Sequence, residues 1–545
     1  MRFSIVIALA AGLLGGVAHA QAPASAEAAA RVDGAFARWS SRETAGCAVA
    51  VGRNGETVLS RAYGMADLEH DAANSPETVF EAGSVAKQFT AAAVVLLAQR
   101  GRLSLDDPVR RYVPELPDHG TPIRIRHVLN HTSGLRDWGT VQEVAGWPRG
   151  TRTYTHAHVL DIVGRQRALN FPPGSQYLYS NTGYNLLAIL VGRVAGVPFA
   201  RFTREQIFAP LGMTQTRWRD DYTRVVKGRA IAYEIGSDSA PRQQMPFENV
   251  HGNGGLLTTV GDLLKWNENL VTGRVGGAAL RDELQRQGVL TTGRRIEYAG
   301  GLVVTRYRGV PEVSHSGATA GYRAWLARYP DQRLSVAVLC NAAEARAGTL
   351  GHRVADLFLP AAAPAPAPAR VAVPRAALAA RAGLYRDRRT SEPLRLEFRG
   401  GELTLNERPL VPLSPTRFRL GDDATVEFEA APAGTRAALR MIGSDGDTLA
   451  FEPVAEWAPA RLADFTGEYR SEEAEVSYTV AVANGKLVLR RRPNARFDLA
   501  PEYADAFTTR DGWVVRFSRD RAGRVTGFGL WLDRVRDLQF RRAGP

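Results

Sequence analysis

The pattern of apolar and polar positions predicts a mixed α/β domain in the first part of the chain. Two apolar runs flank Asn54-Gly55, a dipeptide that accepts the positive φ of a tight turn, and predict a β-hairpin. Strand patterns return between residues 300 and 342. Three segments between these strands carry helical spacing, namely 85–101, 181–196 and 259–273. Strands at both ends with helices between them predict a sheet that joins the two ends of the domain.

A proline- and alanine-rich stretch interrupts this pattern close to residue 360. The sequence PAAAPAPAPARVAVP has too little apolar content to pack and is typical of a stiff spacer. We therefore predict a domain over residues 29–360 and a linker over residues 361–375.

The chain beyond the linker is rich in strand patterns and repeats itself. Gly383-Leu384-Tyr385-Arg386 returns as Gly467-Glu468-Tyr469-Arg470, and the hairpin LRLEFRGGELTL returns at the same offset as YTVAVANGKLVL. The repeat predicts two copies of one small antiparallel β-barrel or sandwich, over residues 376–455 and 456–545.

The N-terminus has the pattern of a secretory signal. Residues 1–20 contain the basic Arg2, an apolar run and the small-residue site Ala18-His19-Ala20. We expect cleavage after Ala20 and a periplasmic or secreted protein. No later apolar run approaches the roughly 18 residues that a membrane span needs, so none is predicted.

The net charge of +13 and the pI near 10.0 raise the question of an anionic partner. The arginines are spread among 56 acidic residues, and the one tight run, Arg490-Arg491-Arg492, is expected on a solvated strand face. These observations and the export signal argue against nucleic acid. Anionic polymers of the cell envelope stay as a second partner hypothesis, and the sequence leaves the oligomeric state open.

The cysteines and histidines do not indicate a metal site. Cys47 and Cys340 stand alone, each on a terminal strand of the predicted sheet, and both one disulfide and two buried thiols remain open. The pairs His127 with His131 and His156 with His158 have no third ligand nearby, and no H-E-x-x-H, P-loop or dinucleotide motif occurs. We therefore predict neither a metal nor an organic cofactor.

One lysine stands out in this arginine-rich chain, which has four lysines among its 69 basic residues. Lys87 follows Ser84 by three residues at the start of a predicted helix, so both side chains lie on one face. A serine hydroxyl becomes a good nucleophile when a neighbouring base takes its proton. Lysine serves as that base if its pKa is lowered, whereas arginine stays protonated. Taken alone, the pair also fits an N-cap serine followed by a solvated lysine. An acyl-enzyme hydrolase is predicted from the pair together with the two further segments.

Two further segments carry candidate site residues. Tyr179 and Asn181 stand just before a predicted helix, where a tyrosine relays protons and an amide holds a substrate carbonyl. His315 and Gly317 lie on a predicted strand, where the glycine lets a substrate backbone approach closely.

In this order, the motifs S-x-x-K, Y-x-N and H-x-G resemble those of the serine penicillin-recognising enzymes, which include class C β-lactamases, penicillin-binding proteins and their esterase and D-aminopeptidase relatives. The resemblance extends to residues 129–138 and 252–266. It implies an antiparallel sheet flanked by helices with a helical subdomain. The two C-terminal β-domains look most like the plan of the bacterial D-aminopeptidases, in which a loop of the last domain reaches the active site.

The resemblance also implies a role for each site residue. Ser84 is the acylated nucleophile, Lys87 its base and Tyr179 the proton relay to the leaving group. The backbone N–H groups of Ser84 and Ala318 form the oxyanion hole. The substrate is bound by residues around them, namely Asn181, His315, Gly317 and Ala318.

The third motif departs from the penicillin-directed pattern, because His315 stands where that pattern has a lysine. A histidine is mostly neutral at pH 7, so carboxylate-bearing substrates look less favoured than small peptides, amino-acid amides or esters. A substrate amine would need a carboxylate partner, for which Glu502 and Asp505 are candidates; the alternative for both is a solvated acidic loop. The alternatives are a class C-type β-lactamase or DD-carboxypeptidase, and a non-catalytic protein that binds the cell envelope.

Overall fold

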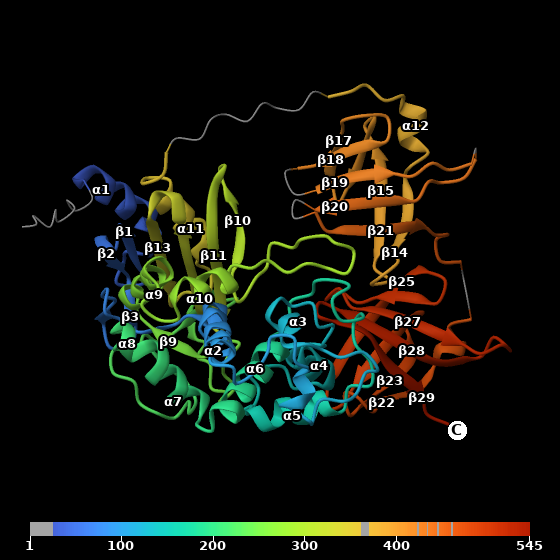
Figure 1. Cartoon of the computed structure of the whole chain (residues 1–545). Helices are drawn as coiled ribbons and strands as arrows, with labels where there is room; N and C mark the ends of the chain where they lie inside the picture. The colour runs from blue at the N-terminus through green and yellow to red at the C-terminus, as the bar shows by residue number, and fades with distance from the viewer. Residues whose placement is uncertain are drawn as a thin grey trace, which may run out of the picture.

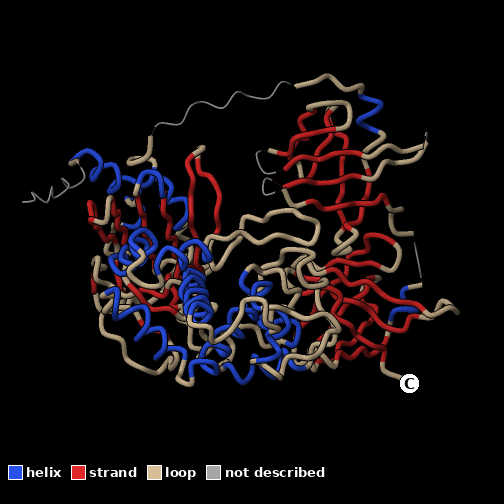
Figure 2. The backbone as a smooth tube through the Cα atoms, viewed as in Figure 1, coloured by secondary structure: helices blue, strands red, loops and turns tan. Residues whose placement is uncertain are grey.

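The computed structural model describes residues 25–360, 370–421, 424–432, 434–443, 446–458 and 461–544. They form a mixed α/β domain followed by two closed antiparallel β-barrels (Figure 1). This confirms the predicted fold class. Helices are concentrated in the first domain, and strands dominate the rest of the chain (Figure 2). The predicted signal segment 1–20 and most of the predicted linker lie outside the described residues.

A six-stranded antiparallel sheet joins the two ends of the first domain, in the order β10-β11-β12-β13-β1-β2. Side chains of alternating positions face opposite layers, so Val49 packs with helices α1 and α11 whereas Ala48 packs with α2 and the other helices. Both faces are covered, which explains the nearly continuous apolar runs of the strands. The elements named here are β1 (Cys47–Arg53), β2 (Glu56–Tyr63), β10 (Val303–Tyr307), β11 (Val310–Thr319), β12 (Tyr322–Tyr329), β13 (Leu334–Cys340), α1 (Ala26–Ala35) and α11 (Ala347–Ala355).

A disulfide links two neighbouring strands of this sheet, β1 and β13. Cys47 and Cys340 are direct partners in the β1–β13 register, and their side chains are bridged. The pairing holds together strands that are separated by 293 positions in the sequence, and it settles the question that the sequence left open.

The helical part of the first domain is built around α2 (Lys87–Gln99), in which every residue from Lys87 to Leu97 is buried. A helix that is buried all round belongs to the core, and α6 packs directly against it. The other helices are α3 (Ile125–Leu129), α4 (Trp138–Ala145), α5 (His156–Gly164), α6 (Asn181–Ala195), α7 (Phe199–Thr203), α8 (Ala209–Leu211), α9 (Val260–Thr272) and α10 (Gly277–Leu284). The short strands are β3 (Met65–Asp67), β4 (Ala72–Ala73), β5 (Phe80–Glu81), β6 (Arg217–Trp218), β7 (Tyr233–Ile235), β8 (Pro241–Gln243) and β9 (Leu256–Thr258).

Among the described residues, no single helix has the length and apolar character of a membrane span. One sharply bent pair, Asn181–Ala195 with Phe199–Leu211, meets that criterion by length and composition alone.

The two barrels are structural repeats, as the sequence repeat predicts. In each, the tyrosine of the repeated motif is fully buried and donates to a carbonyl oxygen four residues earlier, from Tyr385 to Arg381 and from Tyr469 to Phe465. After the short helix α12 (Arg375–Ala379), the first barrel contains β14 (Gly383–Asp387), β15 (Pro393–Arg399), β16 (Glu402–Leu405), β17 (Arg408–Pro412), β18 (Arg417–Leu420), β19 (Ala424–Phe428), β20 (Leu439–Gly443) and β21 (Thr448–Pro453). The second contains β22 (Gly467–Ser471), β23 (Val476–Ala483), β24 (Lys486–Arg491), β25 (Ala495–Tyr503), β26 (Ala506–Thr508), β27 (Val514–Arg519), β28 (Val525–Leu532) and β29 (Val535–Arg542).

The two barrels differ in how they join the first domain. The apolar core of the second barrel is continuous with that of the first domain, whereas the first barrel has a separate core. Tyr478 and Arg491 of the second barrel both donate hydrogen bonds to the carbonyl oxygen of Val144 near the end of α4. The expectation of a solvated face is therefore wrong for Arg491, because the helix end offers unpaired carbonyl groups that a guanidinium satisfies.

Candidate active site

Ser84 lies in the 3-10 turn Gly83–Ala86, which leads from strand β5 into helix α2. The helix begins at Lys87, so the three-residue spacing places both side chains on one side of the turn. Lys87 Nζ lies 3.1 Å from Ser84 Oγ. Ser84 lines a cavity of about 680 Å³, whereas the side chain of Lys87 is fully buried behind it. The structure therefore brings the predicted pair into hydrogen-bond contact.

Two glycines let strand β11 lie against the turn that carries Ser84. A Cβ atom at Gly317 would lie 2.1 Å from the carbonyl oxygen of Ala82, and one at Gly83 would lie 2.6 Å from the backbone nitrogen of Ala318. Gly83 also has a φ of 51°, in the left-handed region that favours glycine. Gly317 is thus required for the approach of the protein's own backbone, in addition to the substrate contact that the sequence suggests. The packing places Ser84 and Ala318 on one wall of the cavity.

A buried ion pair anchors the strand before this turn. Glu81 accepts two hydrogen bonds from Arg219, at 2.9 and 3.0 Å, and both side chains are almost fully buried. Burial alone would raise the pKa of Glu81, but the guanidinium of Arg219 holds that pKa below its usual range. The carboxylate therefore stays charged and fixes the start of the nucleophile turn.

Lys87 is surrounded by uncharged oxygen atoms. Besides the serine, its Nζ contacts Asn181 Oδ1 at 3.0 Å and the carbonyl oxygen of Asn253 at 2.6 Å. Burial lowers the pKa of Lys87 well below its usual range, and the positive charge of Arg534 adds to this effect, which Asp137 partly opposes. A buried amine with a lowered pKa meets the requirement for a general base.

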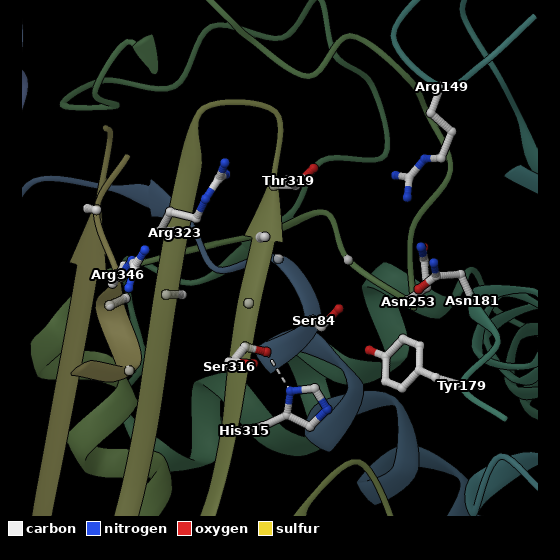
Figure 3. Close-up of a pocket in the computed structure, with 18 of the residues that line it drawn as sticks. Ser84, Arg149, Tyr179, Asn181, Asn253, His315, Ser316, Thr319, Arg323 and Arg346 are labelled. Atoms are coloured by element: carbon white, nitrogen blue, oxygen red, sulfur yellow. Dashed lines mark hydrogen bonds between the residues drawn. The ribbon is translucent and has the colours of Figure 1, made fainter. Parts of the chain in front are cut away.

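Tyr179 lies across the cavity with its hydroxyl turned toward Ser84 (Figure 3). Its ring centroid is 4.7 Å from Lys87 Nζ and 4.9 Å from Arg534 Cζ, and the ring of His131 packs against it with centroids 4.2 Å apart. The hydroxyl is buried and makes no hydrogen bond of ordinary geometry to the described residues. Burial raises the pKa of Tyr179, so the phenol keeps its proton.

Asn181 begins helix α6, and Asp137 holds it in place. The backbone N–H of Asn181 donates to Asp137 Oδ2 at 2.6 Å. Asp137 also caps helix α4 by accepting from the N–H groups of Gly139 and Thr140. This arrangement turns the Asn181 side chain toward Lys87 and into the cavity wall.

His315 lies on β11, the strand next to the edge strand β10, and is held in one tautomer. Its Nδ1 donates to the carbonyl oxygen of Ser316 at 2.5 Å, so Nε2 accepts from the Tyr298 hydroxyl at 3.0 Å. Burial is the main cause that lowers the pKa of His315 to about 4. We therefore expect a neutral imidazole at pH 7, in line with the expectation from the sequence.

The cavity also contains residues that sequence reasoning missed. Arg534, on the hairpin between β28 and β29 of the second barrel, lines the cavity together with Arg149 of the first domain. The Arg534 carbonyl oxygen accepts from Asn170 Nδ2 at 3.0 Å and from the Asp137 backbone nitrogen at 3.4 Å. A loop of the last domain thus reaches the site, as the resemblance implies. Neither Arg534 nor Arg149 stands in a motif that marks it locally.

The two carboxylates considered as partners for a substrate amine lie outside the Ser84 cavity. Glu502 accepts a hydrogen bond from Thr508, and Asp505 pairs with Arg519 within the second barrel. Neither lines the cavity around Ser84, so the hypothesis that they bind a substrate amine there is wrong.

Metal-ligating side chains gather at one place in the described part of the chain. Ligand atoms of Asp67, Glu69 and His70 lie within 4.8 Å of one another, largely exposed and outside the Ser84 cavity.

The turn, the buried lysine and the facing tyrosine define a serine hydrolase whose nucleophile is paired with an amine base. The chain belongs to the beta-lactamase family, whose model, described as Beta-lactamase, matches residues 26–358.

Known proteins extend the similarity beyond that domain. The chain is 28% identical over 527 residues to a D-aminopeptidase from Brucella canis, covering 91% of this chain and 95% of the relative. It is 28% identical over 316 residues to penicillin-binding protein 4* from Bacillus subtilis, covering 54% of this chain and 68% of the relative. The solved octameric penicillin-binding protein homologue from Pyrococcus abyssi has a TM-score of 0.54 and 21% identity, covering 86% of this chain and 98% of that chain. The structural similarity to this homologue supports the fold of the chain.

The influence of Arg534 on Lys87 predicts a pH effect. If the reaction needs the neutral amine, kcat/KM rises with pH through the pKa of Lys87. Arg534→Gln removes a nearby positive charge, so this pKa rises and the acid limb of the profile moves about half to one unit toward higher pH. The measurement is the pH profile of kcat/KM with 4-nitrophenyl acetate, an uncharged ester.

Arg521→Gln is the matched control, because it removes the same charge from an exposed hairpin of the same barrel. Its profile should overlay that of the unaltered protein. A profile of Arg534→Gln that does not move, or that moves toward lower pH, would show that Arg534 does not tune the base.

Proposed function

We propose that the protein is an exported serine hydrolase that cleaves small peptides, amino-acid amides or esters through an acyl-enzyme at Ser84. The observation that carries the proposal is the 3.1 Å contact between Ser84 Oγ and the fully buried Nζ of Lys87. Support for amide substrates comes from the D-aminopeptidase relative, which is aligned over nearly its whole length. Export rests on the N-terminal signal pattern in the sequence.

The first half of the proposed reaction is acylation. A neutral Lys87 amine donates its two hydrogens to Asn181 Oδ1 and the Asn253 carbonyl oxygen, which leaves its lone pair to accept the Ser84 proton. Ser84 Oγ then attacks the substrate carbonyl carbon. The backbone N–H groups of Ser84 and Ala318 stabilise the negative charge that develops on the carbonyl oxygen.

The leaving group then needs a proton before it departs. Tyr179 is placed to pass one on, because its protonated hydroxyl faces Ser84 and has no other hydrogen-bond partner of ordinary geometry among the described residues. Hydrolysis of the acyl-enzyme runs through the same groups, with water in place of the serine hydroxyl. Asn181 and His315 orient the substrate from opposite sides of the cavity (Figure 3).

Active-site labelling tests this proposal directly. A fluorophosphonate probe should react with the folded protein at one site, and peptide mass analysis should place the adduct on Ser84. Protein unfolded in urea should not react, because the lysine base is then no longer in contact with the serine. An adduct on another serine, or equal labelling of the folded and unfolded chains, would contradict the assignment of Ser84.

A β-lactam substrate distinguishes the β-lactamase alternative from the proposed function. A chromogenic cephalosporin reports ring opening at once, and turnover that exceeds hydrolysis of aminoacyl amides and esters would favour this alternative. Hydrolysis rates measured under the same conditions for D- and L-aminoacyl amides then establish the stereochemical preference.

A further inference from the structure

His131 is a buried histidine beside the active site that the proposed reaction does not use. It follows helix α3, is 1% exposed and does not line the cavity around Ser84. Its backbone has a φ of 55°, in the left-handed region that costs free energy for a residue other than glycine. Such a conformation persists only where the surrounding contacts fix it.

Two hydrogen bonds tie His131 to the segment that carries Tyr179. The carbonyl oxygen of His131 accepts from the N–H group of Leu178 at 3.0 Å. Its Nδ1 atom accepts from the N–H group of Ser180 at 3.2 Å. Leu178 and Ser180 are the neighbours of Tyr179 in the chain, so His131 fixes the backbone on both sides of the tyrosine.

The imidazole ring of His131 also packs directly on Tyr179. The two ring centroids are 4.2 Å apart, whereas the rings of Tyr298 and His315 lie 6.0 and 6.3 Å from that of Tyr179. The His131 ring also contacts Tyr298 at 4.5 Å and Tyr184 at 5.1 Å. Both of these tyrosines are buried, and the hydroxyl of each makes a hydrogen bond. The His131 ring therefore connects Tyr179 to two side chains that are themselves held in place.

The His131 ring is neutral. Because Nδ1 accepts the Ser180 N–H group, the ring proton is assigned to Nε2, which makes no hydrogen bond within the described residues. Burial lowers the pKa of His131 well below its usual range, so the imidazole stays uncharged at pH 7. His131 therefore acts on Tyr179 through packing and hydrogen bonding, without a charge of its own.

We propose that His131 is a positioning residue whose ring holds the Tyr179 hydroxyl toward the leaving group. This inference rests on the proposed function and adds a residue to its protonation step. The Tyr179 hydroxyl faces Ser84 without a hydrogen bond of ordinary geometry that would fix its direction, so the packing around its ring sets that direction. A misplacement of about 1 Å can slow a reaction about 10²-fold, so a loosened Tyr179 ring should slow protonation of the leaving group.

Two acetate esters distinguish this role from general support of the fold. 4-Nitrophenolate leaves without a proton, whereas the alcohol of benzyl acetate must be protonated as it leaves. His131→Asn keeps a residue that tolerates the left-handed φ and a short acceptor for the Ser180 N–H group, but it removes the ring. We expect kcat/KM for benzyl acetate to fall about tenfold or more beyond any fall for 4-nitrophenyl acetate. A structural loss would lower both rates by the same factor, because it only reduces the amount of active protein.

A double-variant cycle assigns the effect to Tyr179. Tyr179→Phe should show the same selective loss of benzyl acetate hydrolysis, and adding His131→Asn to it should change the ratio of the two rates less than about twofold. His70→Asn is the matched control, because it removes an imidazole that is 77% exposed and should change neither rate. The ratio does not depend on how much of a preparation is folded, and His131→Gln replaces the asparagine variant if that variant does not fold.

The outcomes separate this inference from the proposed function. An unchanged ratio in His131→Asn, no selective loss in Tyr179→Phe, or an equally large effect of His131→Asn without the tyrosine hydroxyl overturns the positioning proposal. In each of these cases, Ser84-dependent hydrolysis of 4-nitrophenyl acetate would leave the proposed function intact. If Ser84→Ala hydrolyses both esters as fast as the unaltered protein, the proposed function itself is wrong.

Discussion

Lys87→Arg is expected to lower kcat/KM for ester and amide hydrolysis by about 10²- to 10⁴-fold, the range typical of a lost general base. The guanidinium stays protonated and cannot accept the Ser84 proton. Lys87→Met should lose as much, because it fills the buried space with an apolar chain and also removes the base. Steady-state kinetics with an activated ester and an aminoacyl amide measure both losses. Ser84→Ala gives the rate that remains without the nucleophile.

Lys265→Arg is the matched control for this substitution. Lys265 is half exposed and pairs with Asp262 outside the cavity, so arginine can replace it without loss of activity. Circular dichroism and thermal unfolding establish that the Lys87 variants are folded. A folded Lys87→Arg protein that keeps activity within tenfold of the unaltered chain would show that another group takes the serine proton.

Local signals explain why much of the fold could be predicted. The Asn54-Gly55 turn has positive φ at both residues, and the strands that flank it pair as the apolar runs predict. The sequence repeat correctly predicts two similar barrels, because Tyr385 and Tyr469 fill the same buried position and make the same backbone hydrogen bond. Each of these features depends on residues that are close together in the sequence.

The site was predictable to the extent that its residues lie in short motifs. Ser84 and Lys87 are three residues apart, and one turn of backbone suffices to bring them together. Tyr179 and His315 are brought to this pair by long-range packing. No local sequence pattern predicts that packing, and only the resemblance to the known family, based on the order of the motifs, implied it. Gly317 shows a further limit, since its close contact with Ala82 becomes visible only when strand and turn are placed side by side.

Contacts between domains account for what the sequence did not reveal. Arg534 reaches the cavity from the last hairpin of the chain, and no feature of that hairpin distinguishes it from others in the barrel. Arg491 stands in a basic run that looks solvated, yet it donates to carbonyl oxygens at the end of α4. The alternation of charged and apolar residues along a strand indicates which of its faces is buried. It does not indicate which segment of another domain packs against that strand.

The buried ion pair between Arg136 and Glu473 is expected to be the main polar determinant of how the second barrel docks. The two side chains are 1% and 7% exposed and lie 2.5 Å apart, one in the first domain and one in the barrel. Arg136 also donates to the carbonyl oxygens of Arg536 and Asp537, two and three residues after Arg534. The pair therefore connects the position of the Arg534 hairpin to the first domain.

Arg136→Ala should lower the free energy of unfolding by about 3–5 kcal/mol, because it leaves the Glu473 carboxylate buried without its cation. Urea unfolding measured by tryptophan fluorescence gives this value. The double variant Arg136→Met with Glu473→Leu should lose less than Arg136→Ala, since removing both charges leaves no unpaired ion. Glu475→Gln is the control, because its pair with Arg165 crosses the same interface with a 61% exposed carboxylate and should cost less than about 1 kcal/mol. Equal losses in the buried and exposed variants would mean that apolar packing alone sets the docking of the barrel.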